Sequence, residues 1–373
     1  MPKADEGAVL ALKLSVFMSF PRPFMRYTPS SMNWITLEYS KSQVDAAGRT
    51  LADPNATGEQ VNAALNTLNN WRAAHSFPLN TIQVGLRQRA RAAYEHALIA
   101  QRLKRVPSII EKLRRFPTMQ LSRMQDIAGC RAIVETVSHV RRIRVAYARS
   151  QQQHQFVSDK DYIDHPKESG YRGIHLIYRY QSERKPDYNG RLVEIQLRTR
   201  LQHAWATAVE TMSTFLSQSL KSSEGSEKWL RFFTLTSSAF ALLEHTAPVP
   251  GTPPDLRTLR ETIGALESEL QVREKLGTYG EALKIAEDTK MENAYYFLLS
   301  LMPQGYLAVY GYEREQLEEA TAQYLVVEKN LAAIPGAQAV LVAVDSLSAL
   351  KRSYPNYYLD TQIFVESLSR ILE

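Results

Sequence analysis

The chain has 373 residues, of which 44% are hydrophobic, and a formal net charge of +6. This composition is typical of a soluble globular chain, and the length is sufficient for two domains. A single cysteine, Cys130, excludes an internal disulfide framework and a zinc site built from several cysteines, and it favours a reducing cytoplasm. The apolar run at residues 8–20 is interrupted by Lys13 and is too short to span a bilayer, so we expect no membrane partner.

Charge is unevenly distributed along the chain. Residues 249–373 contain 11 basic and 18 acidic residues, a net charge of −7, whereas residues 1–248 have a net charge of +13. A basic segment beside an acidic one suggests a polyanionic ligand for the first, and the two segments could attract each other. A chance difference between solvated surfaces explains the pattern equally well.

The first predicted elements are two helices, at about 35–51 and 58–76. The second has an apolar stripe at helical spacing, formed by Val61, Leu65, Leu68 and Trp71. A turn is predicted at residues 53–55 between the helices, and Pro78 predicts that the second helix ends near residues 77–80.

A strongly basic run follows at residues 87–115. Pro107 suits the first position of a helix that reaches about residue 116, and within it Ser108 and Lys112 share one face. Arg102 and Lys104 lie just before this helix. A helix N-terminus surrounded by basic residues favours phosphate binding, although an ordinary basic surface helix has the same pattern.

A turn that leads into a strand is predicted at residues 124–135, with Asp126 at its entrance and Arg131 on the strand. A lone Asp usually caps a helix or stabilises a turn. Asp126 becomes a candidate metal ligand only if it meets a second carboxylate, Glu194, at one metal ion.

Two further strands are predicted at residues 173–181 and 192–199, joined through turn residues at 188–190. In the second, Val193, Ile195 and Leu197 alternate with polar side chains, so one face suits a core and the other suits Mg2+ and phosphate. These polar side chains are Glu194, Gln196 and Arg198. An ordinary amphipathic strand has the same alternation. Before the pair lies a polar loop, 164–171, whose Lys167 could meet a phosphate and whose Tyr171 could stack on a base.

The rest of the chain predicts helices at 203–222 and 229–243, a proline-rich linker at 245–255, and a small α/β module. The module is expected to contain helices at 256–288, 314–331 and 357–372 and strands at 294–301, 306–312 and 339–344. We interpret His203 as a structural residue rather than a catalyst.

Five blocks in this order resemble the synthetase domain of RelA/SpoT homologues, and the resemblance covers roughly residues 80–245. The blocks are Arg102-x-Lys104-x3-Ser108-x3-Lys112, Asp126-x4-Arg131, Lys160-x6-Lys167-x3-Tyr171-x3-His175, Glu194-x-Gln196-x-Arg198 and His203-x-Trp205. The implied fold is α+β, with a mixed β-sheet flanked by helices of the nucleotidyltransferase-like kind. We expect a synthetase domain at 1–244, a linker at 245–255 and a second, smaller α/β domain at 256–373.

The resemblance also implies roles for individual residues. Arg102 and Arg131 would hold the ATP adenine between them, and Lys104, Ser108 and Lys112 would hold its phosphates. Asp126 and Glu194 would bind Mg2+, and Glu194 would help to deprotonate the attacking hydroxyl. Tyr171 would stack on the acceptor base, and the acceptor and phosphate side would be lined by Lys160, Lys167, His175, Gln196 and Arg198. A ribose 3′-hydroxyl would attack the β-phosphate of ATP and release AMP.

The segment after the linker resembles the antitoxin part of CapRel-type fused toxin–antitoxin proteins, in which a small alarmone synthetase precedes a pseudo-zinc-finger domain. In such fusions a Tyr-x-x-Tyr element would occupy the adenine site, and Tyr354 and Tyr357 match it. Tyrosines that simply pack the last helix are the alternative. A phage structural protein is thought to release such fusions by binding the second domain.

The function expected from these resemblances is an ATP-dependent pyrophosphokinase toxin. It would modify the 3′-CCA end of tRNA, block translation, and act in anti-phage defence. The basic region 1–248 supports a tRNA partner. The alternative enzyme function is synthesis of guanosine or adenosine alarmones, which the motifs barely distinguish from tRNA modification. A non-catalytic nucleotide sensor is disfavoured, because Asp126 and Glu194 are both present.

Overall fold

The structure is a computed structural model of the chain. It describes residues 34–150, 153–215, 227–270, 272–273, 276, 295–301, 307–331, 333–334, 338–343 and 362–373. Tyr354 and Tyr357, the N-terminal apolar run, and the linker-distal part of the helix predicted at 256–288 lie outside these residues. Among the described residues, no helix combines the length and the apolar character that crossing a membrane requires.

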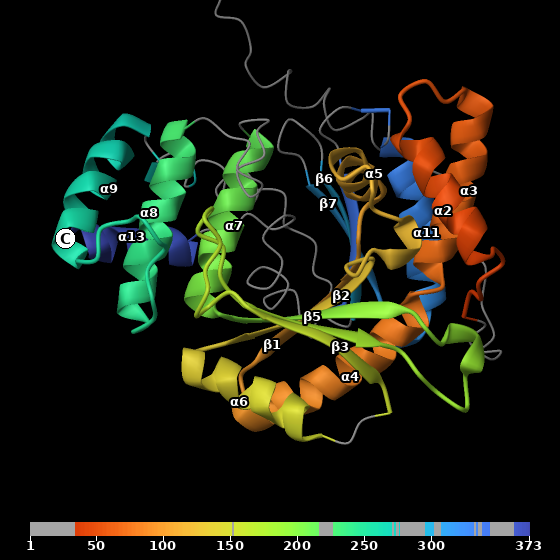
Figure 1. Ribbon diagram of the computed structural model, residues 1–373, viewed down its shortest axis with the longest axis horizontal. Helices are drawn as coiled ribbons and strands as arrows, with labels where there is room; N and C mark the ends of the chain where they lie inside the picture. Colours follow the sequence, from red (N-terminus) through yellow and green to blue (C-terminus); the bar gives the residue numbers. More distant parts are fainter. Residues whose placement is uncertain are drawn as a thin grey trace, which may run out of the picture. The chain divides into compact units, whose positions relative to one another are not determined.

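A mixed β-sheet organises the described part of the chain (Figure 1). Its strand order is β3-β4-β5-β2-β1-β8-β6-β7, in which β2 and β5 are parallel and the other neighbouring pairs are antiparallel. The strands are β1 (Leu98–Leu103), β2 (Ala128–Val134), β3 (Gln155–Asp161), β4 (Ile174–Arg179), β5 (Leu192–Thr199), β6 (Tyr296–Leu301), β7 (Leu307–Tyr312) and β8 (Gln338–Ala343). The predicted α+β class with a mixed sheet is confirmed.

The helices belong to separate packing groups around this sheet. They are α2 (Lys41–Ala52), α3 (Gly58–Ala73), α4 (Ser76–Ala93), α5 (Val106–Arg115), α6 (Val137–Arg149), α7 (Arg200–Phe215), α8 (Glu227–Leu243), α9 (Leu256–Leu270), α11 (Leu317–Leu331) and α13 (Gln362–Leu372). Short 3-10 turns are η2 (Leu121–Arg123), η3 (Pro186–Tyr188) and η5 (Arg314–Gln316). Most predicted elements are therefore present, with boundaries shifted by a few residues.

One face of the first five strands is apolar and is covered by α4 and α6, which Figure 1 shows beneath the sheet. Val193, Ile195 and Leu197 of β5 are fully buried in this core, as the alternation predicted. The opposite face is therefore the polar one. Alternation along each strand leaves it free for a binding site.

Two local predictions were wrong. The first predicted helix begins at Lys41 rather than near residue 35, because Ser40 caps it: Gln43 donates its N–H to Ser40 Oγ, and its side-chain oxygen accepts from the Ser40 N–H. Residues 77–80 do not end a helix. Pro78 lies in the first turn of α4, where a missing N–H leaves no hydrogen bond unmade.

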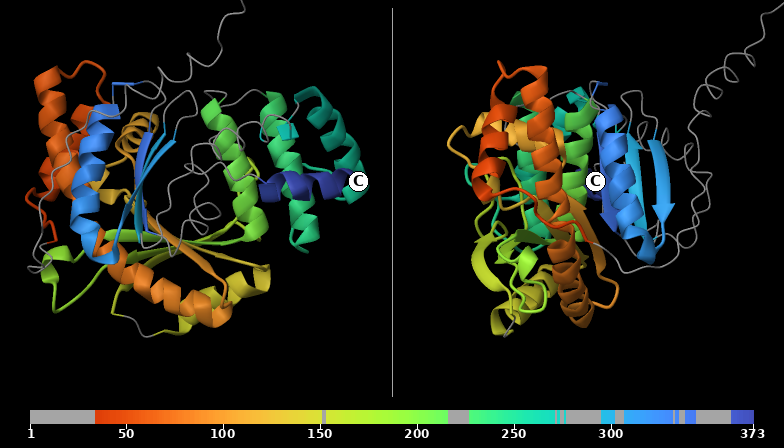
Figure 2. Two further views of the ribbon diagram at one scale, coloured as in Figure 1. Left: turned by 180° about the vertical axis from the view of Figure 1, so that it is seen from behind. Right: turned by 90° about the vertical axis from the view of Figure 1, so that its right-hand side faces the viewer.

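The described residues after the linker pack against those before it. Strand β8 pairs with β1, and α9 and α13 share one apolar core with α7 and α8. Helix α11 covers β6 and β8 and lies between these strands and α3 (Figure 2). Residues 246–255 form neither helix nor strand, and Val249 donates its N–H to Ser238 Oγ of α8. The division into domains at 244 and 256 stays a prediction.

Candidate active site

Strand register brings the predicted polar residues into one row across the sheet. Lys160 of β3 pairs with His175 of β4, His175 pairs with Gln196 of β5, and Gln196 pairs with Arg131 of β2. Directly paired residues point to the same face. Glu194 lies two positions from Gln196 and therefore shares this face, so residues from four strands meet on one surface.

The donor half of the site surrounds Asp126, at the entrance to β2. Lys104 Nζ and Lys112 Nζ each lie 3.0 Å from a different oxygen of the Asp126 carboxylate. Lys104 directly follows β1. Ser108 lies in the first turn of α5, and Lys112 lies one helical turn further along this helix. Two of the residues predicted to hold the ATP phosphates, Lys104 and Lys112, therefore converge on Asp126.

Charge and burial act in opposite directions on these groups. Burial alone would raise the pKa of Asp126, but the two lysines lower it below its usual value, while the nearby Glu194 carboxylate raises it. Burial lowers the pKa of Lys104, against the attraction of Asp126. The charge of Glu194 therefore acts on Asp126, which places the two carboxylates in one electrostatic environment.

A buried network supports the connection between β1 and α5, and nothing in the sequence motifs indicated it. Arg72 of α3 has a fully buried side chain; its Nε donates to the Lys104 carbonyl at 2.9 Å, and its NH1 lies 2.8 Å from Glu328 Oε2. Its NH2 also donates to the Tyr324 hydroxyl. Glu328 Oε1 accepts the Val106 N–H at 2.9 Å and so caps α5, because Arg105 provides no side-chain cap.

The acceptor half is a closed hydrogen-bonded chain. Glu194 Oε1 lies 2.8 Å from His175 Nδ1, and Glu194 Oε2 accepts from Gln196 Nε2 at 2.7 Å. His175 Nε2 lies 2.5 Å from the Tyr171 hydroxyl, to which Arg198 NH2 donates at 2.6 Å. All five side chains were predicted at this site, and the structure brings them together.

The proton affinities in this chain are mutually adjusted. Burial opposes the charged form of His175, but Tyr171 and Glu194 outweigh it and raise its pKa to about 9. Burial would raise the pKa of Tyr171, yet Arg198 and His175 lower it to about 8. His175 and Gln196 hold the pKa of Glu194 well below its usual value despite burial. At neutral pH this hydrogen-bonded network therefore contains a protonated His175 beside the Glu194 carboxylate.

Tyr171 is placed at the site, but its ring is covered. Its side chain is 9% exposed, Lys167 Nζ lies 5.1 Å from the ring centroid, and Arg198 Cζ lies 4.9 Å from it. Stacking on an acceptor base would require one of these cations to leave a ring face. The base-stacking role of Tyr171 stays a prediction.

The predicted adenine-binding arginines lie on neighbouring strands of the same face. Arg102 of β1 pairs with Gly129 of β2, two positions from Arg131. Arg131 NH1 lies 3.4 Å from His203 Nδ1 of α7, so His203 is buried beside a predicted ATP residue. This placement agrees with the interpretation of His203 as structural.

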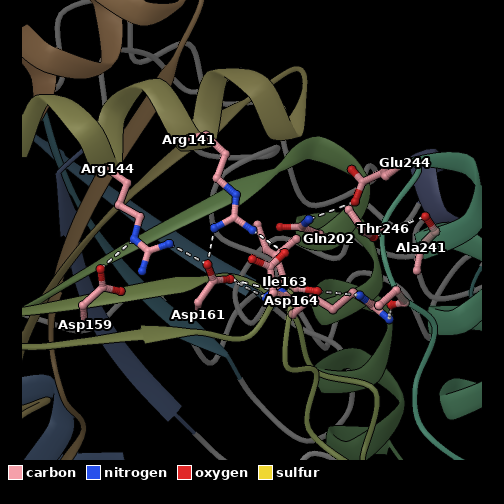
Figure 3. A network of polar contacts seen from close by, with 12 residues as sticks. Arg141, Arg144, Asp159, Asp161, Ile163, Asp164, Gln202, Ala241, Glu244 and Thr246 are labelled. Carbon is pink, nitrogen blue, oxygen red and sulfur yellow. Dashed lines mark hydrogen bonds and ion pairs between the residues drawn. The ribbon is translucent and has the colours of Figure 1, made fainter.

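Strand β3, which was not predicted, is fixed by α6. Arg141 pairs with Asp161 and Asp164, and Arg144 Nε lies 2.6 Å from Asp159 Oδ2 (Figure 3). Since Asp159 and Asp161 turn toward α6, Lys160 between them turns toward the polar face. The alternation Asp-Lys-Asp at residues 159–161 was the sequence signal that could have revealed this strand.

The donor atoms at the centre suit Mg2+. Asp126 and Glu194 supply hard carboxylate oxygens, and no group of three or more His, Cys, Asp or Glu side chains in the described part could hold a metal. Mg2+ is commonly bound by one or two carboxylates together with substrate phosphates. Asp126 and Glu194 would hold the ion, and Mg2+ would neutralise phosphate charge there. Cys130 is buried on the other face and belongs to the core.

Part of the chain is similar to known proteins. Residues 101–217 match the family model for the region found in RelA / SpoT proteins. The chain is 36% identical over 118 residues to the GTP pyrophosphokinase YjbM of Bacillus subtilis (strain 168), which covers 31% of this chain and 55% of that protein. It is 33% identical over 135 residues to the uncharacterized protein Rv1366 of Mycobacterium tuberculosis (strain ATCC 25618 / H37Rv), covering 35% and 45%.

Among solved structures, small alarmone synthetase 1 from Bacillus subtilis bound to pppGpp has 28% sequence identity and a TM-score of 0.39, covering 46% of this chain and 90% of that one. The chain spans about half the length of the curated relatives it matches. Residues 101–217 are thus similar to the region found in RelA / SpoT proteins, and a segment of the chain is similar to a GTP pyrophosphokinase. This region contains the polar face of β2, β4 and β5.

Proposed function

We propose that the chain is an ATP-dependent pyrophosphokinase whose acceptor is a guanosine nucleotide. The observation that carries this proposal is the convergence of two interacting carboxylates, Asp126 and Glu194, with cations on both sides. The GTP pyrophosphokinases YjbM and YwaC of Bacillus subtilis, which are 36% and 32% identical to the matched segments, support a guanosine acceptor.

The reaction would join the acceptor 3′-oxygen to the β-phosphorus of ATP. The bond between that phosphorus and the bridging oxygen of the α-phosphate breaks, AMP leaves, and the hydroxyl proton passes to Glu194. Such transfers depend mainly on positioning and charge stabilisation. A carboxylate of low pKa, such as Glu194, therefore suffices to receive a proton that leaves late.

The residues of the donor half would position ATP. Lys104 and Lys112 already converge on one anion, the Asp126 carboxylate, at 3.0 Å. When phosphates and Mg2+ enter, the lysines would exchange this partner for phosphate oxygens. Protonated His175 contacts both Glu194 and Tyr171, and it would hold the Glu194 carboxylate in a fixed orientation toward the acceptor.

A second candidate acceptor is the 3′-CCA end of tRNA. The net charge of +13 in residues 1–248 favours it, because a tRNA acceptor stem is a larger polyanion than a nucleotide. In this candidate the chain would be a fused toxin–antitoxin. The segment after the linker, with Tyr354 and Tyr357, would inhibit the enzyme until a phage structural protein binds.

An acceptor panel tests the two candidates. Full-length protein would be incubated with ATP labelled at the β-phosphate, Mg2+, and GDP, GTP or tRNA in separate reactions. We expect the label on GDP and GTP and not on tRNA. Label on tRNA alone would reject the guanosine acceptor and select the second candidate.

A further inference from the structure

The loop that carries Tyr171, here called the acceptor loop, comprises residues 162–173 and joins β3 to β4. Two hydrogen bonds within the loop shape it. The Lys167 N–H donates to the Tyr171 carbonyl at 3.2 Å, and the Gly170 N–H donates to the Lys167 carbonyl at 2.8 Å. These bonds close a turn inside the loop, so contacts with other elements have to fix where that turn lies.

Ser237 of α8 contacts both sequence neighbours of Tyr171. Its hydroxyl donates to the Gly170 carbonyl at 2.5 Å and accepts from Arg172 Nε at 3.1 Å. Gly170 has a φ of +89°, and a Cβ added to it would lie 2.9 Å from Ser237 Cβ. Glycine at this position therefore permits the close approach of the loop to α8. One buried hydroxyl thus contacts the residues on both sides of Tyr171.

Arg172 extends these contacts beyond α8. It is 3% exposed, its NH1 donates to the Ile163 carbonyl at 3.2 Å, and its NH2 donates to the Ala247 carbonyl at 2.6 Å. Burial lowers the pKa of Arg172 to about 10, against the attraction of Glu244, so the guanidinium is charged at neutral pH. A buried cation is costly unless hydrogen bonds satisfy it, and the three acceptors of Arg172 lie on the loop, on α8 and after α8.

The anchors of the acceptor loop come from a later part of the chain. The loop itself lies within residues 101–217, which match the family model, whereas α8 and Ala247 come after them. Ala247 belongs to the proline-rich segment 245–255. The chain that follows the matched region therefore takes part in holding Tyr171 in place.

We propose that Arg172 and Ser237 are positioning residues for the acceptor half, which hold the acceptor loop against α8 and the Ala247 carbonyl. The proposal rests on the proposed guanosine acceptor, and it names two residues that affect acceptor binding through Tyr171. A loop that is ordered in advance lowers the entropic cost of binding a ligand. The donor half around Asp126 is built by β1, α5 and the entrance to β2, so a loosened loop should leave ATP binding unchanged.

Initial rates of the full-length protein test this division. Ser237→Ala removes the shared hydroxyl, and we expect KM for GTP to rise about tenfold while KM for ATP changes less than about twofold. Arg172→Lys keeps the charge but not the planar fork, and should shift KM for GTP in the same direction. Ser238→Ala is the matched control, because this buried hydroxyl contacts Val249 and Thr252 and not the loop. It should leave both KM values unchanged.

Two kinetic results would overturn the proposal. One is an unchanged KM for GTP in both Ser237→Ala and Arg172→Lys. The other is an equal rise of both KM values in Ser237→Ala and Ser238→Ala, which would show a general loss of packing around α8.

Amide hydrogen exchange in the absence of nucleotides gives a readout that does not depend on the acceptor. We expect the peptide 162–173 to exchange about tenfold faster in Ser237→Ala than in Ser238→Ala, because the loop opens more often once its anchor is lost. Equal exchange in the two variants would reject the anchoring role. Faster exchange in a protein that transfers no label to guanosine nucleotides would support the anchoring role and reject the proposed function.

Discussion

The two halves of the candidate site are built differently. The donor half consists of three partly exposed charged groups, in which Lys104 and Lys112 share the single Asp126 carboxylate. The acceptor half is a chain of hydrogen bonds in which Tyr171, His175 and Glu194 already satisfy each other. The donor half can therefore exchange partners when ATP enters, whereas the acceptor half has to open before a base reaches Tyr171.

The largest expected effect comes from the point where the halves meet. Glu194→Gln retains the shape of the side chain but removes the charge, and we expect transfer to fall by roughly a thousandfold, on the scale of losing a dominant electrostatic group. Initial rates with GTP measure it, and thermal unfolding checks that the variant is folded. If the variant kept activity within tenfold of the wild type, Glu194 would have no catalytic role.

Glu328→Gln tests whether the Arg72–Glu328 network stabilises the donor half. This change leaves the buried Arg72 guanidinium without its ion pair, and we expect a loss of about 3 kcal/mol in the free energy of unfolding. Denaturant titration measures it. Glu319→Gln on the same helix is exposed and should change stability by less than about 0.5 kcal/mol. Equal effects of the two changes would show that the network does not support α5.

The acceptor half predicts a pH dependence. The pKa of His175 is raised to about 9, so the stability that its charged form contributes is complete below the unfolded pKa near 6.5 and is lost as pH rises toward 9. Between pH 6.5 and 7.5, below the Tyr171 pKa of about 8, we expect a loss of about 1 kcal/mol. Unfolding titrations should show this slope in the wild type and a flat response in His175→Gln. The same slope in that variant would contradict the assignment to His175.

The smallest predicted effect concerns ATP alone. Lys112→Met removes one of the two cations around Asp126, and we expect KM for ATP to rise about tenfold while KM for GTP changes little. The exposed Arg114→Met on the same helix is the control. A larger change in KM for GTP than for ATP would reverse the assignment of the two halves.

Much of the acceptor half could be predicted because alternation is a local property. Residues 193–197 alternate between apolar and polar side chains, and the apolar ones are buried while Glu194 and Gln196 are only partly buried. The order of the motif blocks then indicated which polar residues meet. No local pattern indicated that β2 and β5 would be parallel neighbours, which is the pairing that places Glu194 beside Gly129.

The remaining features depend on contacts between distant segments. Arg72 and Glu328 are 256 residues apart, and each alone looks like an ordinary charged helix residue. Strand β1 was missed because Gln101 and Arg102 interrupt its apolar residues. Helix α4 was missed because Pro78 was interpreted as a terminator. The anchors of the acceptor loop on α8 and at Ala247 have no signature in the loop sequence itself.

The most direct test of the central claim is a single reaction with full-length protein, Mg2+, GTP and ATP labelled at the β-phosphate. We predict that the label moves to the guanosine nucleotide as a 3′-pyrophosphate, with one AMP released per transfer. Release of ADP and phosphate, or label that never reaches the guanosine nucleotide, would contradict it.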